Sequence, residues 1–294
     1  MQIRPRRSAL YMPGSNARAI EKAKSLPADV VIFDLEDAVA PEAKATARAQ
    51  VAAAVAQGGY GRRELVIRVN GLDTPWGSDD LKAAAAAAPD AILLPKVSSP
   101  ATLANVAAAL VDRPGKTKVW AMIETPLAIL NLREIAAAAG DPSTRLACFV
   151  IGTNDLVKET RAELDGSRSA ALYWLSATVT AARGFGLDVL DGVFNNFKDF
   201  EGFRRECVQG RQLGVDGKTL IHPDQISAAN EVFSPSAAEL AAARKIIAAF
   251  ELSENKGKGV ITVEGRMVEL MHLDMARRTV QIADAVADTG AGGV

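Results

Sequence analysis

Charged residues follow short apolar runs at several points of this 294-residue chain. The clearest case is residues 119–127 (VWAMIETPL), where an apolar run is followed by Glu124 and, two residues later, by Pro126. Proline does not continue a central strand, so the chain turns there. In a parallel α/β protein, an acid at the carboxyl end of a buried strand faces the ligand crevice. We therefore predict that Glu124 binds a metal.

The same arrangement recurs elsewhere in the chain. If the ends of these apolar runs meet at one barrel mouth, their charged groups converge from distant parts of the sequence. Any one of them alone is more simply explained as a solvated loop charge or a helix cap. The recurrence over five runs favours a shared site, whose members are Asp34, Glu36, Asp37, Arg68, Lys96, Glu124 and Asp155.

Glu124 and Asp155 follow consecutive runs and form the predicted metal pair. One or two carboxylates, completed by water, are the usual protein ligands of Mg²⁺. No histidine or cysteine is close in sequence, which favours Mg²⁺ or Mn²⁺ over zinc. The alternative is that both acids cap the helices that follow, a role that Asp155 can combine with metal binding.

Arg68 lies inside an apolar run, where a guanidinium needs an acid or an anionic ligand as its partner. Its planar fork suits a substrate carboxylate or a developing enolate oxygen. The alternative is a structural ion pair with Asp34, Glu36 or Asp37. Both can hold, because an acid can orient the arginine. We count Arg68 and Asp37 among the catalytic candidates.

Lys96 follows Pro95 after an apolar run. Lysines form Schiff bases with carbonyl substrates, but the metal pair makes such chemistry redundant. We interpret Lys96 as electrostatic support and count it, with Glu124 and Arg68, among the substrate-binding candidates. His222 is one of two histidines, and we expect it to be a buried orienting residue.

Strand-like runs alternate with helix-like segments along most of the chain. The alanine-rich stretches between the runs have high helix propensity and amphipathic spacing. Eight alternations predict a (β/α)8 TIM barrel. A doubly wound sheet is the competitor, but neither GxGxxG nor GxxxxGK[ST] occurs. The expected strands are residues 8–12, 30–33, 64–69, 91–94, 119–123, 146–151, 187–190 and 214–220.

The C-terminal part has a different pattern. We expect residues 1–233 to form the catalytic barrel and residues 234–294 a helical extension that packs on it or on a neighbouring subunit. In this extension the pattern predicts a helix at residues 237–252, a turn-rich linker at 254–259, a short hairpin at 260–265 and a helix at 266–287. The glycine-rich tail, residues 290–294, is expected to be mobile.

Composition excludes several classes of protein. The formal net charge is −1 without a basic block, which argues against nucleic-acid binding. No apolar run approaches the roughly 20 residues of a membrane span, and the N-terminus lacks a signal-peptide core. The two cysteines, Cys148 and Cys207, form no CxxC pair. We expect a cytoplasmic protein.

Seven short motifs together resemble one family. They are RSxLxxPGS at residues 7–15, FDLEDAV at 33–39, RVN at 68–70, LPK at 94–96, ETP at 124–126, GxxDL at 152–156 and GKxxIHP at 217–223. In this order they resemble the citrate lyase β-subunit-like (CitE-like) group of the HpcH/HpaI aldolase superfamily, which includes malyl-CoA and citramalyl-CoA lyases.

The resemblance implies a Mg²⁺-dependent carbon–carbon lyase on a TIM barrel. Its substrate would be a β-hydroxyacyl-CoA thioester such as malyl-CoA, citramalyl-CoA or citryl-CoA, and its products an acyl-CoA and a 2-oxo acid. By position, Arg68 contacts the substrate while Glu124 and Asp155 bind Mg²⁺. Arg7, Pro13 and Gly14 belong to a segment that would help to seat CoA. The resemblance also implies a homotrimer or homohexamer whose C-terminal segments reach neighbouring active sites.

One segment departs from the family pattern. Lyases of this group usually have Gly-Lys-Met-Val/Ile-Asp-x-Pro near the C-terminus, whereas residues 265–272 read GRMVELMH. The candidate acid/base is therefore Glu269, one methylene longer than aspartate, and the proline is absent. A misplacement of about 1 Å can cost about a hundredfold in rate. Either Glu269 acts from a shifted backbone, or the chemistry or substrate differs.

Three alternatives follow. The chain is a malyl-CoA thioesterase, a CoA-independent 2-oxo acid aldolase, or a non-catalytic subunit that needs the partner chains of a citrate lyase-type complex. The products formed by the purified chain distinguish them.

Overall fold

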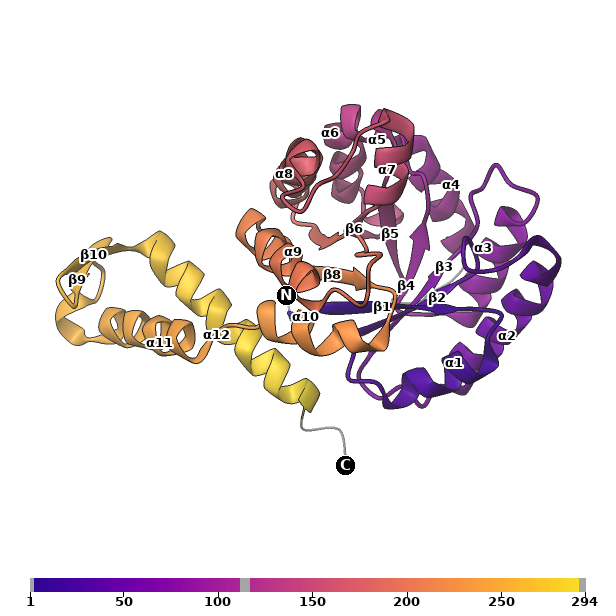
Figure 1. Ribbon diagram of the computed structural model, residues 1–294. Coiled ribbons are helices and arrows are strands. Elements are labelled where there is room, and N and C mark those ends of the chain that lie inside the picture. Colours follow the sequence, from indigo (N-terminus) through magenta and orange to yellow (C-terminus); the bar gives the residue numbers. More distant parts are fainter. Residues whose placement is uncertain (1–2, 112–116, 291–294) are drawn as a thin grey trace. The chain divides into compact units, whose positions relative to one another are not determined.

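Eight parallel strands form a closed barrel in the computed structural model, which describes residues 3–111 and 117–290 (Figure 1). Each strand pairs with its neighbours in sequence, and β8 closes the barrel on β1. The predicted (β/α)8 barrel is confirmed. The strands are β1 (Ser8–Pro13), β2 (Val30–Asp34), β3 (Glu64–Arg68), β4 (Ala91–Leu94), β5 (Lys118–Ile123), β6 (Leu146–Ile151), β7 (Asp188–Asp191) and β8 (Gly217–Leu220).

Helices surround the barrel on its outer side (Figure 1). They carry small and aliphatic residues toward the strands, as in α2, where Ala47, Val51 and Ala54 are buried. In chain order the α-helices of this part are α1 (Ala17–Lys22), α2 (Lys44–Gln57), α3 (Gly77–Ala87), α4 (Pro100–Leu110), α5 (Pro126–Leu130), α6 (Leu132–Ala137), α7 (Thr153–Thr160), α8 (Leu172–Gly184), α9 (Phe200–Leu213) and α10 (Ile226–Val232).

The interior of the barrel is filled by every second residue of the strands. One buried apolar cluster includes the pairs Val30 and Ile32, Ala91 and Leu93, Trp120 and Met122, and Cys148 and Val150. Residues two apart share one face of a strand. The next position on the inner face is therefore Asp34 in β2, Arg68 above Val66 in β3, and Glu124 just after β5. The polar groups form the last layer of the packed barrel.

Some expected elements have different bounds. The alanine-rich stretch at residues 127–139, for which the sequence pattern predicts one helix, forms two helices, α5 and α6, which meet at Asn131. The Asn131 side chain donates to the Ser98 carbonyl oxygen at 2.8 Å and holds the break in place. The last barrel strand begins at Gly217 instead of Gly214, because Gly214 ends α9 in the left-handed conformation with a φ of 97°.

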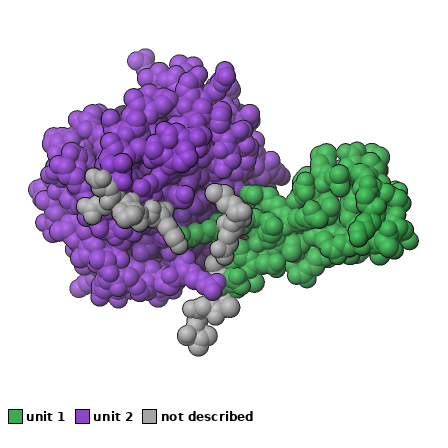
Figure 2. Space-filling model, turned by 180° about the vertical axis from the view of Figure 1, so that it is seen from behind, with its two compact units in different colours: residues 1–5, 232–294 green, residues 6–231 purple. Residues whose placement is uncertain are grey.

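The chain divides into two compact units (Figure 2): residues 6–231, drawn in purple, and residues 1–5 with 232–294, drawn in green, labelled unit 1 in the figure and called the second unit here. In the second unit, α11 (Ala237–Glu251) packs along α12 (Leu270–Gly290), and β9 (Val260–Val263) pairs with β10 (Arg266–Glu269). The helix expected from residue 266 begins at Leu270. The preceding residues form a strand because Gly265, with a φ of 77°, lets the chain reverse. Residues 291–294 of the tail lie outside the described residues.

Within residues 3–111 and 117–290, no helix has both the length and the apolar character of a transmembrane span.

Candidate functional site

A cavity of about 300 Å³ lies at the carboxyl ends of the barrel strands. Asp34, Asp37, Arg68, Glu124 and Asp155 all line it, so the structure brings together five of the predicted site residues. Tyr11, Met122 and residues 151–154 complete much of its wall. A larger surface hollow of about 410 Å³ lies along α9. It gathers no strand ends, and we therefore place the site in the barrel.

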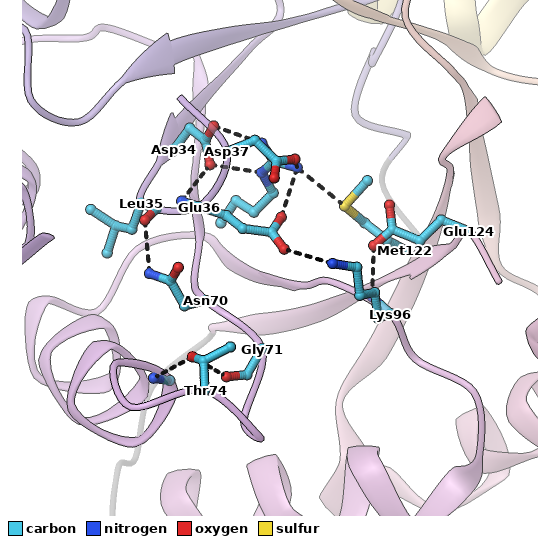
Figure 3. A network of polar contacts seen from close by, with 12 residues as sticks. Asp34, Leu35, Glu36, Asp37, Asn70, Gly71, Thr74, Lys96, Met122 and Glu124 are labelled. Atoms are coloured by element: carbon cyan, nitrogen blue, oxygen red, sulfur yellow. Dashed lines mark hydrogen bonds and ion pairs between the residues drawn. The ribbon is translucent and has the colours of Figure 1, made fainter. Parts of the chain in front are cut away.

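Arg68 is held by three acids at the end of β3. Its Nε and Nη2 donate to the two carboxylate oxygens of Asp34 at 2.7 and 2.6 Å. Its Nη1 lies 2.9 Å from Glu36 Oε2 and 3.2 Å from Asp37 Oδ2. Figure 3 shows these acids gathered in one network. Burial opposes the charge of Arg68, but Tyr11 and the acids outweigh it and raise the pKa of the guanidinium. The ion-pair alternative is therefore realised within the pocket.

Glu36 and Lys96 extend this network beside the cavity. Lys96 Nζ lies 3.8 Å from Glu36 Oε1, and neither residue lines the cavity itself. Burial raises the pKa of Glu36 to about 7, helped by Asp37 and opposed by Arg68. Burial alone would lower the pKa of Lys96, but Glu36, Asp155 and Glu124 raise it. Lys96 thus stays charged and offsets part of the negative charge around the cavity.

Glu124 is 2% exposed and has one carboxylate oxygen committed. Its Oε1 accepts the backbone N–H of Lys96 at 2.7 Å (Figure 3). Burial raises the pKa of Glu124 to about 8; Glu36 and Asp155 add to the rise, while the Lys96 N–H and Arg68 oppose it. A buried carboxyl with a raised pKa in a polar cavity is a functional-site feature.

Gly152 makes room for Glu124. A Cβ on Gly152 would lie 2.5 Å from Glu124 Oε2 and 2.4 Å from Glu124 Cβ, closer than real contacts. Gly152 precedes α7, whose first turn carries Asp155 to the cavity wall. The end of β6 therefore both admits one acid and presents the other. The motif at residues 152–156 contains Gly152, but only the packing explains why the residue is a glycine.

The donors present fit a hard divalent cation. No set of three or more His, Cys, Asp or Glu side chains surrounds one metal position in the part of the chain that the structure describes. Glu124 Oε2 and Asp155 are carboxylate donors in the same cavity, which leaves the other positions to water and substrate. This oxygen-only, partly open set suits Mg²⁺ or Mn²⁺ and does not suit zinc.

Other predicted residues lie elsewhere. Arg7 precedes β1 and pairs with Asp29 at 2.7 Å, so it joins the amino ends of β1 and β2 at the far end of the barrel. Pro13 ends β1 on the cavity side, and the Gly14 N–H donates to the Asp34 carbonyl oxygen at 2.8 Å. A Cβ on Gly14 would lie 2.7 Å from that oxygen. The structure thus brings Pro13 and Gly14 to the cavity end of the barrel, but not Arg7.

Glu269 and His222 also have defined surroundings. Glu269 ends β10 in the second unit, where its backbone N–H donates to His272 Nδ1 at 3.0 Å. The expectation of a buried His222 was wrong, because its side chain is 37% exposed. His222 stacks on Phe197 at 4.6 Å and accepts the Asp224 N–H.

Sequence reasoning missed Tyr11, which lines the cavity with its ring against Arg68 at 4.8 Å. Its run, SALYM, contains no charge, and only the alternation of inner and outer positions places Tyr11 above Ala9 inside the barrel. It also missed the amide pair of Asn154 and Asn195, which joins the first turn of α7 to the loop after β7 at 2.9 Å.

Comparison with known proteins shows full-length relatives. A (3S)-malyl-CoA thioesterase of Cereibacter sphaeroides is 49% identical over 99% of both chains. A citrate lyase subunit beta of Leuconostoc mesenteroides subsp. cremoris is 38% identical over 96% of this chain and 94% of its own. The crystal structure of CitE from Mycobacterium tuberculosis, in complex with magnesium, acetoacetate and coenzyme A, matches with a TM-score of 0.77 and 28% identity over 97% of this chain and 100% of its own.

The family profile described as HpcH/HpaI aldolase/citrate lyase matches residues 7–223. These residues include all the strands of the barrel and the cavity at their carboxyl ends. The chain therefore belongs to the HpcH/HpaI aldolase/citrate lyase family, as a CitE-like member.

Proposed function

We propose that this protein hydrolyses a malyl-CoA-type thioester with the help of Mg²⁺ bound by Glu124 and Asp155. The observation that carries the proposal is the 49% identity to a (3S)-malyl-CoA thioesterase over 99% of both chains. The identity to the citrate lyase subunit is lower, at 38%. Magnesium and coenzyme A are both bound in the related CitE structure, which supports the same two ligands here.

The cavity residues fit this reaction. Mg²⁺ would supply a positive charge that fixes and polarises the carboxylate and hydroxyl of the malyl group. Arg68, oriented by Asp34 and Glu36, lines the same cavity and balances the charge of the acids around it. Asp37 lines the cavity and has a side chain that is 68% exposed, so it is placed to accept a proton from an entering water molecule.

The balance of the reaction is simple. The oxygen of one water molecule bonds to the thioester carbon, and the carbon–sulfur bond breaks with its electron pair on sulfur. The proton lost by water ends on the CoA sulfur. The products are malate and CoA.

A carbon–carbon lyase is the second candidate. It is supported by family membership and by the citrate lyase relative, which covers 96% of this chain. In that reaction the substrate hydroxyl loses its proton, the bond between the second and third carbons breaks, and the thioester enolate takes a proton. Glu269 is our candidate for the last proton transfer. Malyl-CoA would then yield acetyl-CoA and glyoxylate.

Product analysis decides between the two. The purified chain is incubated with (3S)-malyl-CoA and Mg²⁺, with phenylhydrazine present to trap glyoxylate. We expect free CoA and malate in equal amounts and no glyoxylate phenylhydrazone. Equal amounts of acetyl-CoA and hydrazone would instead establish the lyase. If neither appears, the proposal is wrong, and addition of candidate partner chains tests the non-catalytic subunit.

A further inference from the structure

Tyr11 occupies a distinctive position at the cavity. It lies on the inner face of β1, above Ala9, and packs against the apolar cluster that fills the barrel. Its ring contacts the Arg68 guanidinium at 4.8 Å. It also lines the same cavity as Glu124. The ring is therefore held on two sides while the side chain borders the space where a substrate would bind.

The Tyr11 hydroxyl makes no hydrogen bond with any residue in the described ranges 3–111 and 117–290. Other polar groups of the wall are already engaged. Asn154 and Asn195 bond to each other at 2.9 and 3.3 Å. The Thr219 hydroxyl donates to the Asp191 carbonyl oxygen at 2.9 Å. The Thr153 hydroxyl also has no partner among these residues, but it lies against Gly192, where a Cβ would be 2.6 Å away.

Arg68 is a poor substitute for this donor. Its Nε, Nη1 and Nη2 all donate to acids at 3.2 Å or less. Its positive charge is shared among Asp34, Glu36 and Asp37. A new negative charge on the substrate therefore gains little from a guanidinium that is already neutralised. A neutral, unpartnered hydroxyl on the same wall provides a donor without a prior partner.

We propose, on the basis of the function proposed above, that the Tyr11 hydroxyl donates a hydrogen bond to the thioester carbonyl oxygen of the substrate. That oxygen becomes negative when water adds to the carbonyl carbon, and also when carbon–carbon cleavage leaves an enolate. The proton stays on Tyr11 throughout, so the balance of either reaction is unchanged. Burial raises the pKa of Tyr11 well above its ordinary value, which keeps the hydroxyl a donor.

The test is Tyr11→Phe, which removes one oxygen and keeps the ring beside Arg68. Loss of an oxyanion donor lowers kcat by about 100-fold or more, and we expect that loss with KM changed by less than about threefold. The matched control is Tyr173→Phe on α8, whose side chain is 66% exposed; its rates should equal those of the wild type. Circular dichroism and Mg²⁺ titration check that both variants fold and bind the metal.

A second readout does not depend on the net reaction. Exchange of the acetyl-CoA methyl protons with solvent deuterium reports formation of the thioester enolate, and Tyr11→Phe should slow it by a similar factor. An active wild type with an unchanged variant overturns the role of Tyr11 alone. A rise in KM at constant kcat also overturns it, because the bond would then serve the ground state. A wild type inactive in both assays overturns this role together with the proposed function.

Discussion

Glu124 combines deep burial with a carboxylate oxygen that faces a cavity. Its other oxygen is fixed by the backbone of Lys96, so the side chain cannot swing away to find solvent. The neighbouring acids Glu36 and Asp155 make its ionised form still less favourable. A divalent cation relieves both penalties at once. The same geometry that costs stability without a cation therefore provides affinity for one.

Stability should depend on pH and on Mg²⁺ in a linked way. The pKa of Glu124 is raised from 4.5 to about 8, so the metal-free folded protein retains a proton that the unfolded chain releases. Metal-free stability therefore falls as the pH rises between these values. Mg²⁺ binds the deprotonated carboxylate, so its stabilising effect should grow as the pH rises toward 8. Thermal melting in Mg²⁺ and in EDTA across this range measures the difference.

Glu36 titrates in the same range, because its pKa is about 7, and it contributes to the metal-free trend with the same sign. Glu124→Gln separates the two groups. It should abolish the Mg²⁺-induced rise in Tm at every pH while a weaker metal-free pH dependence remains. A wild-type rise in Tm that is the same at all pH values would contradict the assignment of Glu124.

The residues of the site were predictable to different degrees. Glu124, Asp155 and Arg68 could be predicted because charges at the ends of apolar runs are rare and recur here. Tyr11 could not, because a tyrosine in a strand is ordinary; we propose a role for it only because the polar groups around it are already hydrogen-bonded. Arg7 belongs to the same motif as Pro13 and Gly14 and was expected to help to seat CoA with them. It lies before β1, however, and pairs with Asp29.

At the scale of elements, the end of β6 and the start of α7 shape the surroundings of the proposed metal pair, Glu124 and Asp155. Because residue 152 is a glycine, the chain between β6 and α7 can pass close to Glu124. The first turn of α7 then places Asp155 at the cavity wall. The two acids are thus positioned by one short junction. A substitution at this junction should weaken metal binding and leave the structure of the rest of the barrel unchanged.

Gly152→Ala tests this junction. The added methyl group would overlap Glu124 and push its carboxylate from the cavity, so we expect Mg²⁺ affinity to fall by about 10- to 100-fold, as when a support of a metal ligand is lost. Calorimetric titration with Mg²⁺ measures it. Gly140→Ala is the control, because nothing lies within 4 Å of its added Cβ. Equal affinity in the two variants would show that Gly152 does not hold the site open.

Strands were easier to predict than helices. Most of the strands are short, largely apolar runs, and that signal is local; β8, with the sequence GKTL, is the exception. The sequence of α9 contains Gly202 and Gly210, which disfavour a helix. Gly210 is present because a Cβ there would lie 3.1 Å from Asp191 Oδ2. Tertiary packing therefore requires a glycine at position 210. Because glycine has low helix propensity, the sequence alone gives a weak signal for α9.

At the scale of the whole molecule, the second unit carries Glu269 while the barrel carries the metal pair. Our proposal that residues 234–294 serve a neighbouring barrel in a homotrimer or homohexamer makes each active site a product of two chains. Two separately inactive variants should then complement each other. A site within one chain cannot be repaired in this way.

Mixing Glu124→Gln with Glu269→Gln tests the arrangement. If the chain acts as the carbon–carbon lyase, in which Glu269 transfers the last proton, each variant alone should form almost no glyoxylate from (3S)-malyl-CoA. After unfolding and refolding together, about a quarter of the sites should combine an intact barrel with an intact Glu269 by random assortment. The rate of glyoxylate formation measures the recovery, and Glu124→Gln mixed with Asp155→Asn is the control that should recover nothing. If the first mixture stays inactive, Glu269 does not act in a neighbouring chain.

The inward-facing positions of the strands have one more consequence. Asp34 lies two residues after Ile32, and Glu124 two residues after Met122. Each carboxylate therefore occupies the next inward-facing position after a side chain of the barrel core. A substitution in the interior of such a barrel affects the site, because a core side chain of a different size shifts the carboxylate at the next inward-facing position. Among relatives of this chain, substitutions in the barrel core should therefore change the turnover number. Compensating substitutions should occur on the same strand more often than on the other side of the cavity.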